Sequence, residues 1–159
     1  DTTREQAAAV LLRAYQGLKT KVGVTAVSAA PAGAVLAESL TGTSGAVPLS
    51  PRAAVEQVYD AAVKAGRGGS VTINAVPAAQ TVKGGKAGEL RTLSQEELSA
   101  YLSNSDVQKA RSGRFDSSYL IYKEKDGSTT VVWYESETDI AEKTELCKLL
   151  GIKTVYVLK

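Results

Sequence analysis

The side chains available for chemistry in this chain are carboxylates, tyrosines, lysines and hydroxyls, because its 159 residues include no histidine and one cysteine. Without histidine, neither a Ser-His-Asp nor a Cys-His relay can form. Histidine-bearing zinc sites are excluded as well, and one thiolate cannot make an all-cysteine site. Cys147 falls on the apolar stripe of a predicted helix, which indicates a buried structural thiol rather than a nucleophile. We therefore expect no cofactor and no bound metal.

Glu135 is a carboxylate that directly follows two aromatic residues at the end of a predicted strand. Most enzymes that hydrolyse a glycosidic bond use two carboxyl groups in one cleft. Asp116 or Asp139 in the same cleft would supply the second group and indicate an enzyme. The alternative interpretation is that Glu135 is a charge at the boundary between a strand and the helix that follows it.

Aromatic side chains gather in the same part of the chain, at Tyr119, Tyr122, Trp133 and Tyr134. Rings of this kind combine a large apolar surface with a polar group, and they can stack on sugar rings. They could therefore form a glycan-binding surface. The alternative is that Trp133 lies in the core and that the tyrosines only pair across a β-hairpin.

The composition is that of an ordinary globular protein, with 43% hydrophobic and 23% charged residues. The net charge of +2 is too small to predict binding to nucleic acid or to an acidic membrane surface. The sequence contains no run of eighteen apolar residues, so we expect no membrane insertion.

Hydrophobic spacing predicts alternating helices and strands. Helices are expected to begin near residues 3, 51, 95 and 137. Glycine and proline predict loops at 40–49 and 83–88, and Asp126-Gly127 predicts the turn of a hairpin. The predicted strands are 21–28, 34–37, 71–76, 117–123, 129–134 and 154–158.

Helix ends carry the clearest local signals. Ser94 with Glu97 forms a capping box, and Ser136 with Asp139 is a similar start for the last helix. Gly151 is a typical residue to end that helix. The last strand, helix and strand follow one another so closely that we expect the two strands to be parallel neighbours with a right-handed crossover.

A family resemblance rests on Trp133-Tyr134-Glu135, followed by Ile140, Lys143, Leu146 and Gly151-Ile152 at matching spacing. These residues resemble the end of a family 18 glycoside hydrolase domain of the chitinase-like, spore-cortex type. The segments GAVPLSPRAAVEQVYDAAVKAG and SVTINAVPA extend the resemblance to about residues 45–159. It implies an α/β fold, a partial or reduced (β/α) barrel-like domain with a β-hairpin insertion.

The departures from that family concern its catalytic residues. The family carries a D-x-x-D-x-D-x-E run whose last glutamate is the acid, and no D-x-D occurs in this chain. Ala79 stands where the family has a cleft tyrosine, and Leu158 is nearest to the position of its usual final tryptophan. We therefore expect no catalytic residues and no enzymatic activity.

Residues 1–17 carry a second resemblance. TREQAAAVLLRAY is similar to the closing helix of an S-layer homology module, a family that anchors proteins to cell-wall polysaccharide. The resemblance implies that Arg4 helps to hold the polymer, although Glu5 and Gln6 depart from the family's T-R-A-E motif. A helix that only packs is the alternative. We expect residues 18–159 to form one α/β domain.

Six predicted strands cannot close an eight-stranded barrel, so open sheet edges are expected, and such edges are usually covered. We expect the strand at 21–28 and the terminal strand to be edges. At least one should pair with a second copy or with a missing partner segment; cover by the first helix is the alternative.

These observations predict a non-catalytic, extracellular or cell-envelope domain with a structural or self-assembling role. A glycan- or peptidoglycan-binding module is the first alternative, with cell-wall polysaccharide as its partner. A fragment of a family 18-type hydrolase is the second. The residues expected to bind glycan are Trp133, Tyr134, Glu135, Tyr122, Tyr119 and Arg4.

Overall fold

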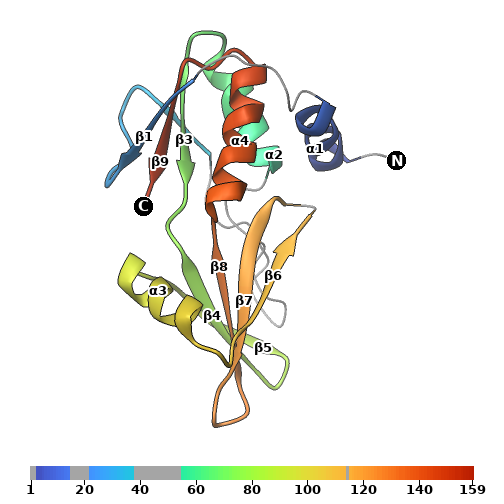
Figure 1. Cartoon of the computed structure of the whole chain (residues 1–159), viewed down its shortest axis with the longest axis vertical. Coiled ribbons are helices and arrows are strands. Elements are labelled where there is room, and N and C mark those ends of the chain that lie inside the picture. The colour runs from blue at the N-terminus through green and yellow to red at the C-terminus, as the bar shows by residue number, and fades with distance from the viewer. Residues whose placement is uncertain (1–2, 15–21, 38–54, 114) are drawn as a thin grey trace.

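The computed structural model describes residues 3–14, 22–37, 55–113 and 115–159 (Figure 1). The predicted loop at 40–49 and the predicted helix start at 51 lie outside these ranges. The described residues form four helices and nine strands, arranged in two sheets. In chain order they are α1 Arg4–Ala14, β1 Gly23–Val27, β2 Val35–Ala37, α2 Val55–Ala65, β3 Ser70–Asn74, β4 Ala78–Lys83, β5 Lys86–Thr92, α3 Gln95–Ser103, β6 Gln108–Ser112, β7 Ser117–Lys123, β8 Thr129–Tyr134, α4 Glu137–Leu149 and β9 Thr154–Leu158.

The first sheet is parallel, with the order β1-β9-β3-β2. Val71 of β3 is paired with Val155 of β9, and both are fully buried. Strands buried in this way read as apolar runs because helices cover them. Here α2 and α4 supply the cover, and residues such as Val58 and Leu146 pack with the strands in one core. Helix α1 lies against α2 and α4, with Ala8 in the same core.

The second sheet is antiparallel, with the order β5-β4-β8-β7-β6. Helix α3 covers one of its faces, where Leu98 packs with Leu120 and Val132. The two sheets are joined end to end, because β3 continues through residues 75–77 into β4 and β8 leads directly into α4 (Figure 1). The start of α4 therefore lies at the junction of the two sheets.

The predicted helix signals are confirmed. Both capping boxes are present, at Ser94 with Glu97 and at Ser136 with Asp139. Gly151 follows α4 with a φ of 81°, a left-handed conformation that glycine adopts without a steric penalty. The hairpin of β7 and β8 is also confirmed, with Tyr119 paired with Trp133.

Three strands were not predicted, namely β4, β5 and β6. The predicted loop at 83–88 is confirmed only at Gly84 and Gly85, which form the turn of a hairpin, whereas the residues on either side belong to β4 and β5. Gly84 and Gly85 have positive φ at that turn. Strands β5 and β6 are exposed at almost every position, so they lack the alternation that marks a half-buried strand.

The predicted pairing of the last two strands is wrong. Strand β8 belongs to the antiparallel sheet, whereas β9 lies in the parallel sheet between β1 and β3. Helix α4 thus connects two sheets instead of crossing over within one. The terminal strand is consequently not an edge, because β1 and β3 flank it on both sides. The prediction that the strand at 21–28 is an edge is confirmed, since β1 pairs with β9 alone among the described strands.

Candidate functional site

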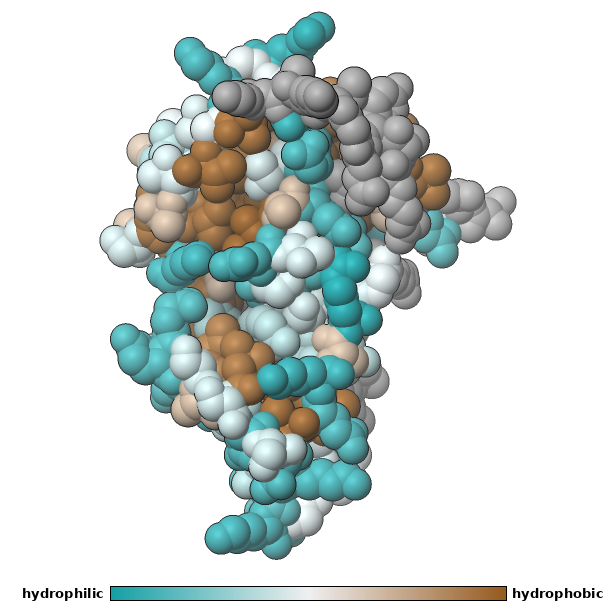
Figure 2. Space-filling view, in the orientation of Figure 1, coloured by the Kyte–Doolittle hydropathy of each residue, from teal (hydrophilic) through white to brown (hydrophobic). Residues whose placement is uncertain are grey.

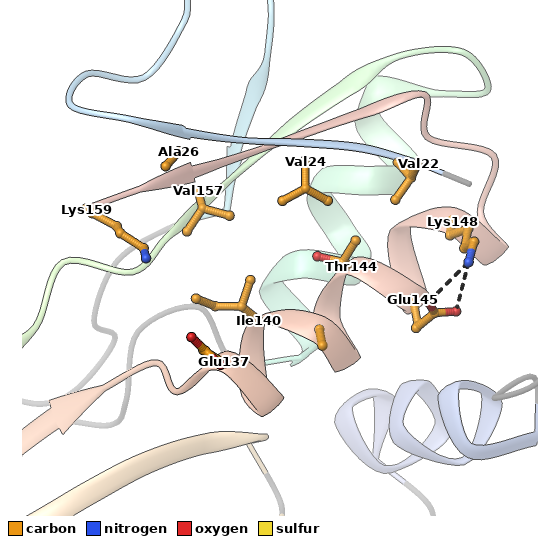
Figure 3. A pocket seen from close by; sticks show the side chains of 11 residues that line it. Val22, Val24, Ala26, Glu137, Ile140, Thr144, Glu145, Lys148, Val157 and Lys159 are labelled. Carbon is orange, nitrogen blue, oxygen red and sulfur yellow. Dashed lines mark hydrogen bonds and ion pairs between the residues drawn. The ribbon is translucent and has the colours of Figure 1, made fainter. Parts of the chain in front are cut away.

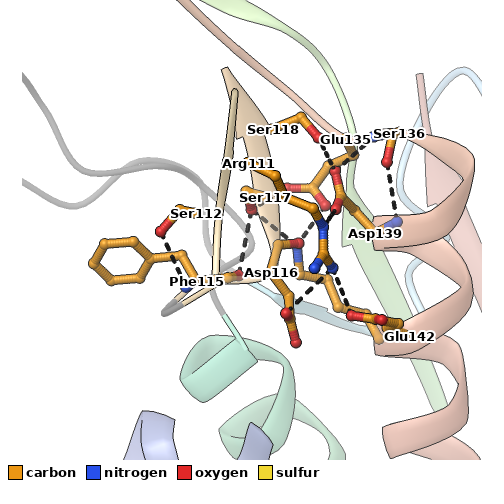
Figure 4. A network of polar contacts seen from close by, with 11 residues as sticks. Arg111, Ser112, Phe115, Asp116, Ser117, Ser118, Glu135, Ser136, Asp139 and Glu142 are labelled. Carbon is orange, nitrogen blue, oxygen red and sulfur yellow. Dashed lines mark hydrogen bonds and ion pairs between the residues drawn. The ribbon is translucent and has the colours of Figure 1, made fainter. Parts of the chain in front are cut away.

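A network of charged side chains lies where β7, β8 and α4 meet (Figure 4). Glu135, just after β8, forms an ion pair with Lys143 of α4 and accepts a hydrogen bond of 2.7 Å from the Ser117 hydroxyl. Lys143 Nζ also donates to Ser117 Oγ at 2.9 Å and to the backbone carbonyl of Asp116 at 2.7 Å. The side chains of Lys143 and Glu135 are 0% and 1% exposed. Each charge is therefore enclosed with its partners.

Asp139 is the centre of the second half of this network. Its carboxylate accepts hydrogen bonds of 2.6 Å from Arg111 Nε and 2.6 Å from the Ser118 hydroxyl. It also accepts a bond of 2.9 Å from the backbone N–H of Ser136, as part of the capping box. One buried carboxylate thus caps α4 and holds β6 and β7 against it.

Arg111 links Asp139 to two further carboxylates. Its Nη2 donates to Asp116 at 3.2 Å and to Glu142 at 2.5 Å. Asp116 has a φ of 49°, a left-handed conformation that aspartate adopts more readily than most residues. This turn places the Asp116 carboxylate beside Arg111 while its carbonyl accepts from Lys143.

Burial and charge shift the pKa values of these carboxyl groups in different directions. Burial raises the pKa of Glu135 to about 7, against the opposite influence of Lys143 and Ser117. Burial and then the nearby charge of Glu142 raise the pKa of Asp116. Burial also acts to raise the pKa of Asp139, but hydrogen bonds from Ser118, Arg111 and Ser136 outweigh it and lower that pKa.

The sequence analysis considered that Glu135 could form a catalytic pair with either Asp116 or Asp139. The structure brings all three carboxylates together. It also surrounds them with two cations, Arg111 and Lys143. Neither cation was predicted to belong to a site from the spacing of the sequence. Lys143 was noted only through the family resemblance. The one local signal is its spacing of three residues from Ile140 and four from Cys147, which places a lysine beside the apolar stripe of the helix, where an unpaired lysine is rarely buried.

The aromatic residues of the predicted glycan-binding set lie on two opposite faces of the antiparallel sheet. Tyr119 and Trp133 are paired across β7 and β8, with ring centroids 4.6 Å apart. Tyr122 and Tyr134 point to the other face, where Tyr101 of α3 lies 6.3 Å from Tyr122 and Tyr134 packs beside α3. A flat sugar surface made from all four rings is therefore not formed.

The two remaining residues of the predicted set are apart from the aromatic rings. Glu135 lies in the buried network described above. Arg4, on α1, forms ion pairs with Glu56 at 3.7 Å and with Asp60, both on α2. Cys147 is buried as predicted, and burial raises the pKa of its thiol to about 12. No helix among the described residues is long and apolar enough to cross a membrane.

No protein-family model matches this chain, and no curated protein matches it in sequence. Its structure is similar to the spore cortex-lytic enzyme SleL of Bacillus megaterium, with a TM-score of 0.61 at 18% identity over 98% of this chain and 42% of that one. SleL of Bacillus cereus gives a TM-score of 0.62 at 14% identity, with the same coverage of both chains. A chitinase of Chromobacterium violaceum gives 0.58 at 20% identity, over 96% of this chain and 55% of that one.

The fold is therefore that of a glycoside hydrolase-like domain, with a parallel sheet and an antiparallel sheet that match a partial barrel. The predicted fold class is confirmed. The chain spans about half the length of these similar structures, because the match covers 42% to 55% of each. The comparisons give no support to the S-layer homology resemblance of residues 1–17, which stays a prediction.

Proposed function

We propose that this chain is a non-catalytic domain of a protein at the cell envelope, in which a glycoside hydrolase-like fold serves as a structural scaffold. The observation that carries the proposal is that the Glu135 carboxylate is buried and fully hydrogen-bonded. Both oxygens of its carboxylate are bonded, one to Ser117 and one to Lys143, and its side chain is 1% exposed. A general acid must reach the glycosidic oxygen, and a general base must reach a water molecule.

Asp139 and Asp116 are held in the same way. Asp139 is fully buried and binds three donors, while Asp116 is 4% exposed at its side chain and faces Arg111. A raised pKa such as that of Glu135 often marks a catalytic acid, but buried structural networks produce the same shift. The enclosure of these groups favours the structural explanation.

The proposed location rests on the similar structures. Two of them are named spore cortex-lytic enzymes and one is a chitinase. We infer from these names that this chain is also exported and acts at the cell envelope.

We expect no hydrolysis of chitooligosaccharides or peptidoglycan by the purified chain, because Glu135, Asp116 and Asp139 are all enclosed by their hydrogen-bond partners. The measurement is the release of reducing ends across pH 4 to 8. Glu135→Gln is compared with Glu89→Gln, which changes an exposed glutamate of β5. Release by the wild type that persists in Glu89→Gln and disappears in a folded Glu135→Gln chain would overturn the proposal.

A second candidate function is glycan binding, favoured by the Tyr119–Trp133 pair. Their rings lie 4.6 Å apart on the sheet face opposite α3, and both side chains are partly exposed. Sugar stacking there would use two neighbouring rings of one face. The four-ring surface predicted from the sequence is replaced by this smaller one.

If the chain binds glycan, Tyr119→Ala should weaken its retention on insoluble cell-wall polysaccharide about fivefold, because a stacked ring contributes about 1 kcal/mol. Tyr122→Ala is the matched control on the opposite face and should be retained like the wild type. Equal retention of all three proteins would remove the Tyr119–Trp133 surface from consideration.

A further inference from the structure

An apolar groove of about 580 Å³ lies between β1, β9 and α4 (Figure 3). In the space-filling view it coincides with the hydrophobic patch at the upper left (Figure 2). Glu137, Glu145, Lys148 and Lys159 add charges to its lining. The rest of the lining consists of Thr144 and of six apolar residues, which are Val22, Val24, Ala26, Ile140, Ala141 and Val157.

The groove lies where β1, at the edge of the parallel sheet, is not covered by any helix of the described residues. Parallel strands are normally covered by helices on their faces. Here α2 packs on β2 and β3, and α4 packs beside β9, but Val24 of β1 remains 52% exposed. Thr144 is 7% exposed and lines the groove, and its hydroxyl has no hydrogen-bond partner among the described residues. An apolar surface with a buried, unpaired hydroxyl indicates a place for an occupant.

Helix α1 has the complementary surface. Ala8 and Ala9 face inward and are buried, whereas Ala7, Val10 and Leu11 are exposed on the opposite side. Their spacing of three and four residues makes them one apolar stripe on a helix. Val10 is 57% and Leu11 is 40% exposed. The chain thus carries a helix with an uncovered apolar stripe and a groove without a helix, on opposite sides of the α2 and α4 layer (Figure 1).

We propose that α1 of a second copy of this chain fills the groove. The proposal rests on the scaffold function proposed above. The dimensions agree, because α1 has 11 residues and is about 16 Å long, and the groove-lining part of α4 from Glu137 to Lys148 rises by about 16 Å. The contact joins two different surfaces, so each copy can use both at once and the association continues as an open chain.

The helix dipoles favour one direction for the incoming helix, because the partial positive charge at its N-terminus can lie beside the partial negative charge at the C-terminus of α4. When it runs antiparallel to α4, its first turn reaches the end of α4 that carries Glu145 and Lys148. Arg4 keeps its ion pairs with Glu56 and Asp60 of its own α2 and takes no part in the contact. The exposed amide of Gln6, one turn before Val10, borders the stripe and supplies a polar group near the unpaired Thr144 hydroxyl.

The test uses sedimentation of the whole chain from about 1 µM to 1 mM, a range that covers weak and moderate affinities. Leu11→Glu changes only the stripe, and Val24→Glu changes only the groove, both at exposed positions. Leu90→Glu is the matched control, because Leu90 is 42% exposed on β5, away from both surfaces. We expect the wild type and Leu90→Glu to self-associate and each of the other variants to sediment as a monomer.

Mixing the two defective variants distinguishes this contact from a symmetric one. Leu11→Glu keeps an intact groove and Val24→Glu keeps an intact α1, so an equimolar mixture should form a dimer and no larger species. A mixture that stays monomeric, or self-association that persists in either variant alone, would overturn the α1–groove contact. A wild type that is monomeric throughout would overturn self-association itself, and neither result depends on the hydrolysis assay.

Discussion

Lys143→Met is expected to destabilise the fold by about 3–5 kcal/mol, because it leaves the Glu135 carboxylate buried without its cation. Glu135 is 1% exposed at its side chain, so water cannot replace the lost partner. Denaturant unfolding measures the change. Lys123→Met is the matched control at an exposed lysine of β7 and should change stability by less than about 0.5 kcal/mol. A Lys143→Met chain within about 1 kcal/mol of the wild type would contradict the structural role of the pair.

The cost of Lys143→Met should also depend on pH. The pKa of Glu135 in the fold is about 7, above its ordinary value of 4.5. A carboxyl group with a raised pKa contributes stability below its unfolded pKa and loses it as pH rises through its folded pKa. Removing Lys143 removes an influence that lowers this pKa, so it rises further. The destabilisation should therefore be smaller at pH 5 than at pH 8.

Asp139→Ala is expected to cost about 2–4 kcal/mol, because it removes one half of the capping box of α4 and leaves Arg111 and Ser118 without their shared acceptor. Glu137→Ala, in the same first turn but exposed, is the control and should cost less than about 1 kcal/mol. Thermal and denaturant unfolding measure both. An equal loss in the two variants would mean that Asp139 acts only through the helix dipole.

Asp139 also predicts the opposite pH response to that of Glu135. Its pKa is lowered from 3.8, so its contribution is present above the unfolded pKa and is lost as pH falls through the folded one. The difference in stability between the wild type and Asp139→Ala should therefore shrink below about pH 4.

Much of the fold could be predicted from the sequence because its signals are local. The caps at Ser94 and Ser136, the end of α4 at Gly151 and the hairpin around Asp126-Gly127 each depend on a few neighbouring residues. The neighbours of β8 and β9 could not be predicted in this way. Their separation into two sheets depends on the whole segment from β4 to β8, whose exposed strands β5 and β6 carry no apolar alternation.

The site was predictable only in part. Glu135, Asp116 and Asp139 were considered together, but the contact of Arg111 with Asp139 joins residues 28 positions apart, and no spacing rule indicates it. The placement of the aromatic rings on two opposite faces of the sheet could have been predicted from the sequence. Side chains alternate along a strand, so Tyr119 and Tyr122 had to lie on opposite faces of the predicted hairpin.

A double-mutant cycle on Glu135 and Lys143 tests most directly whether these groups are structural. The unfolding free energies of Glu135→Gln, Lys143→Met and the double variant are compared with that of the wild type. We predict that the double variant recovers most of the loss of Lys143→Met, with a coupling energy of about 3 kcal/mol or more, because a buried pair replaced as a whole costs little. Additive losses, with a coupling energy near zero, would contradict the structural pair and leave Glu135 available for another role.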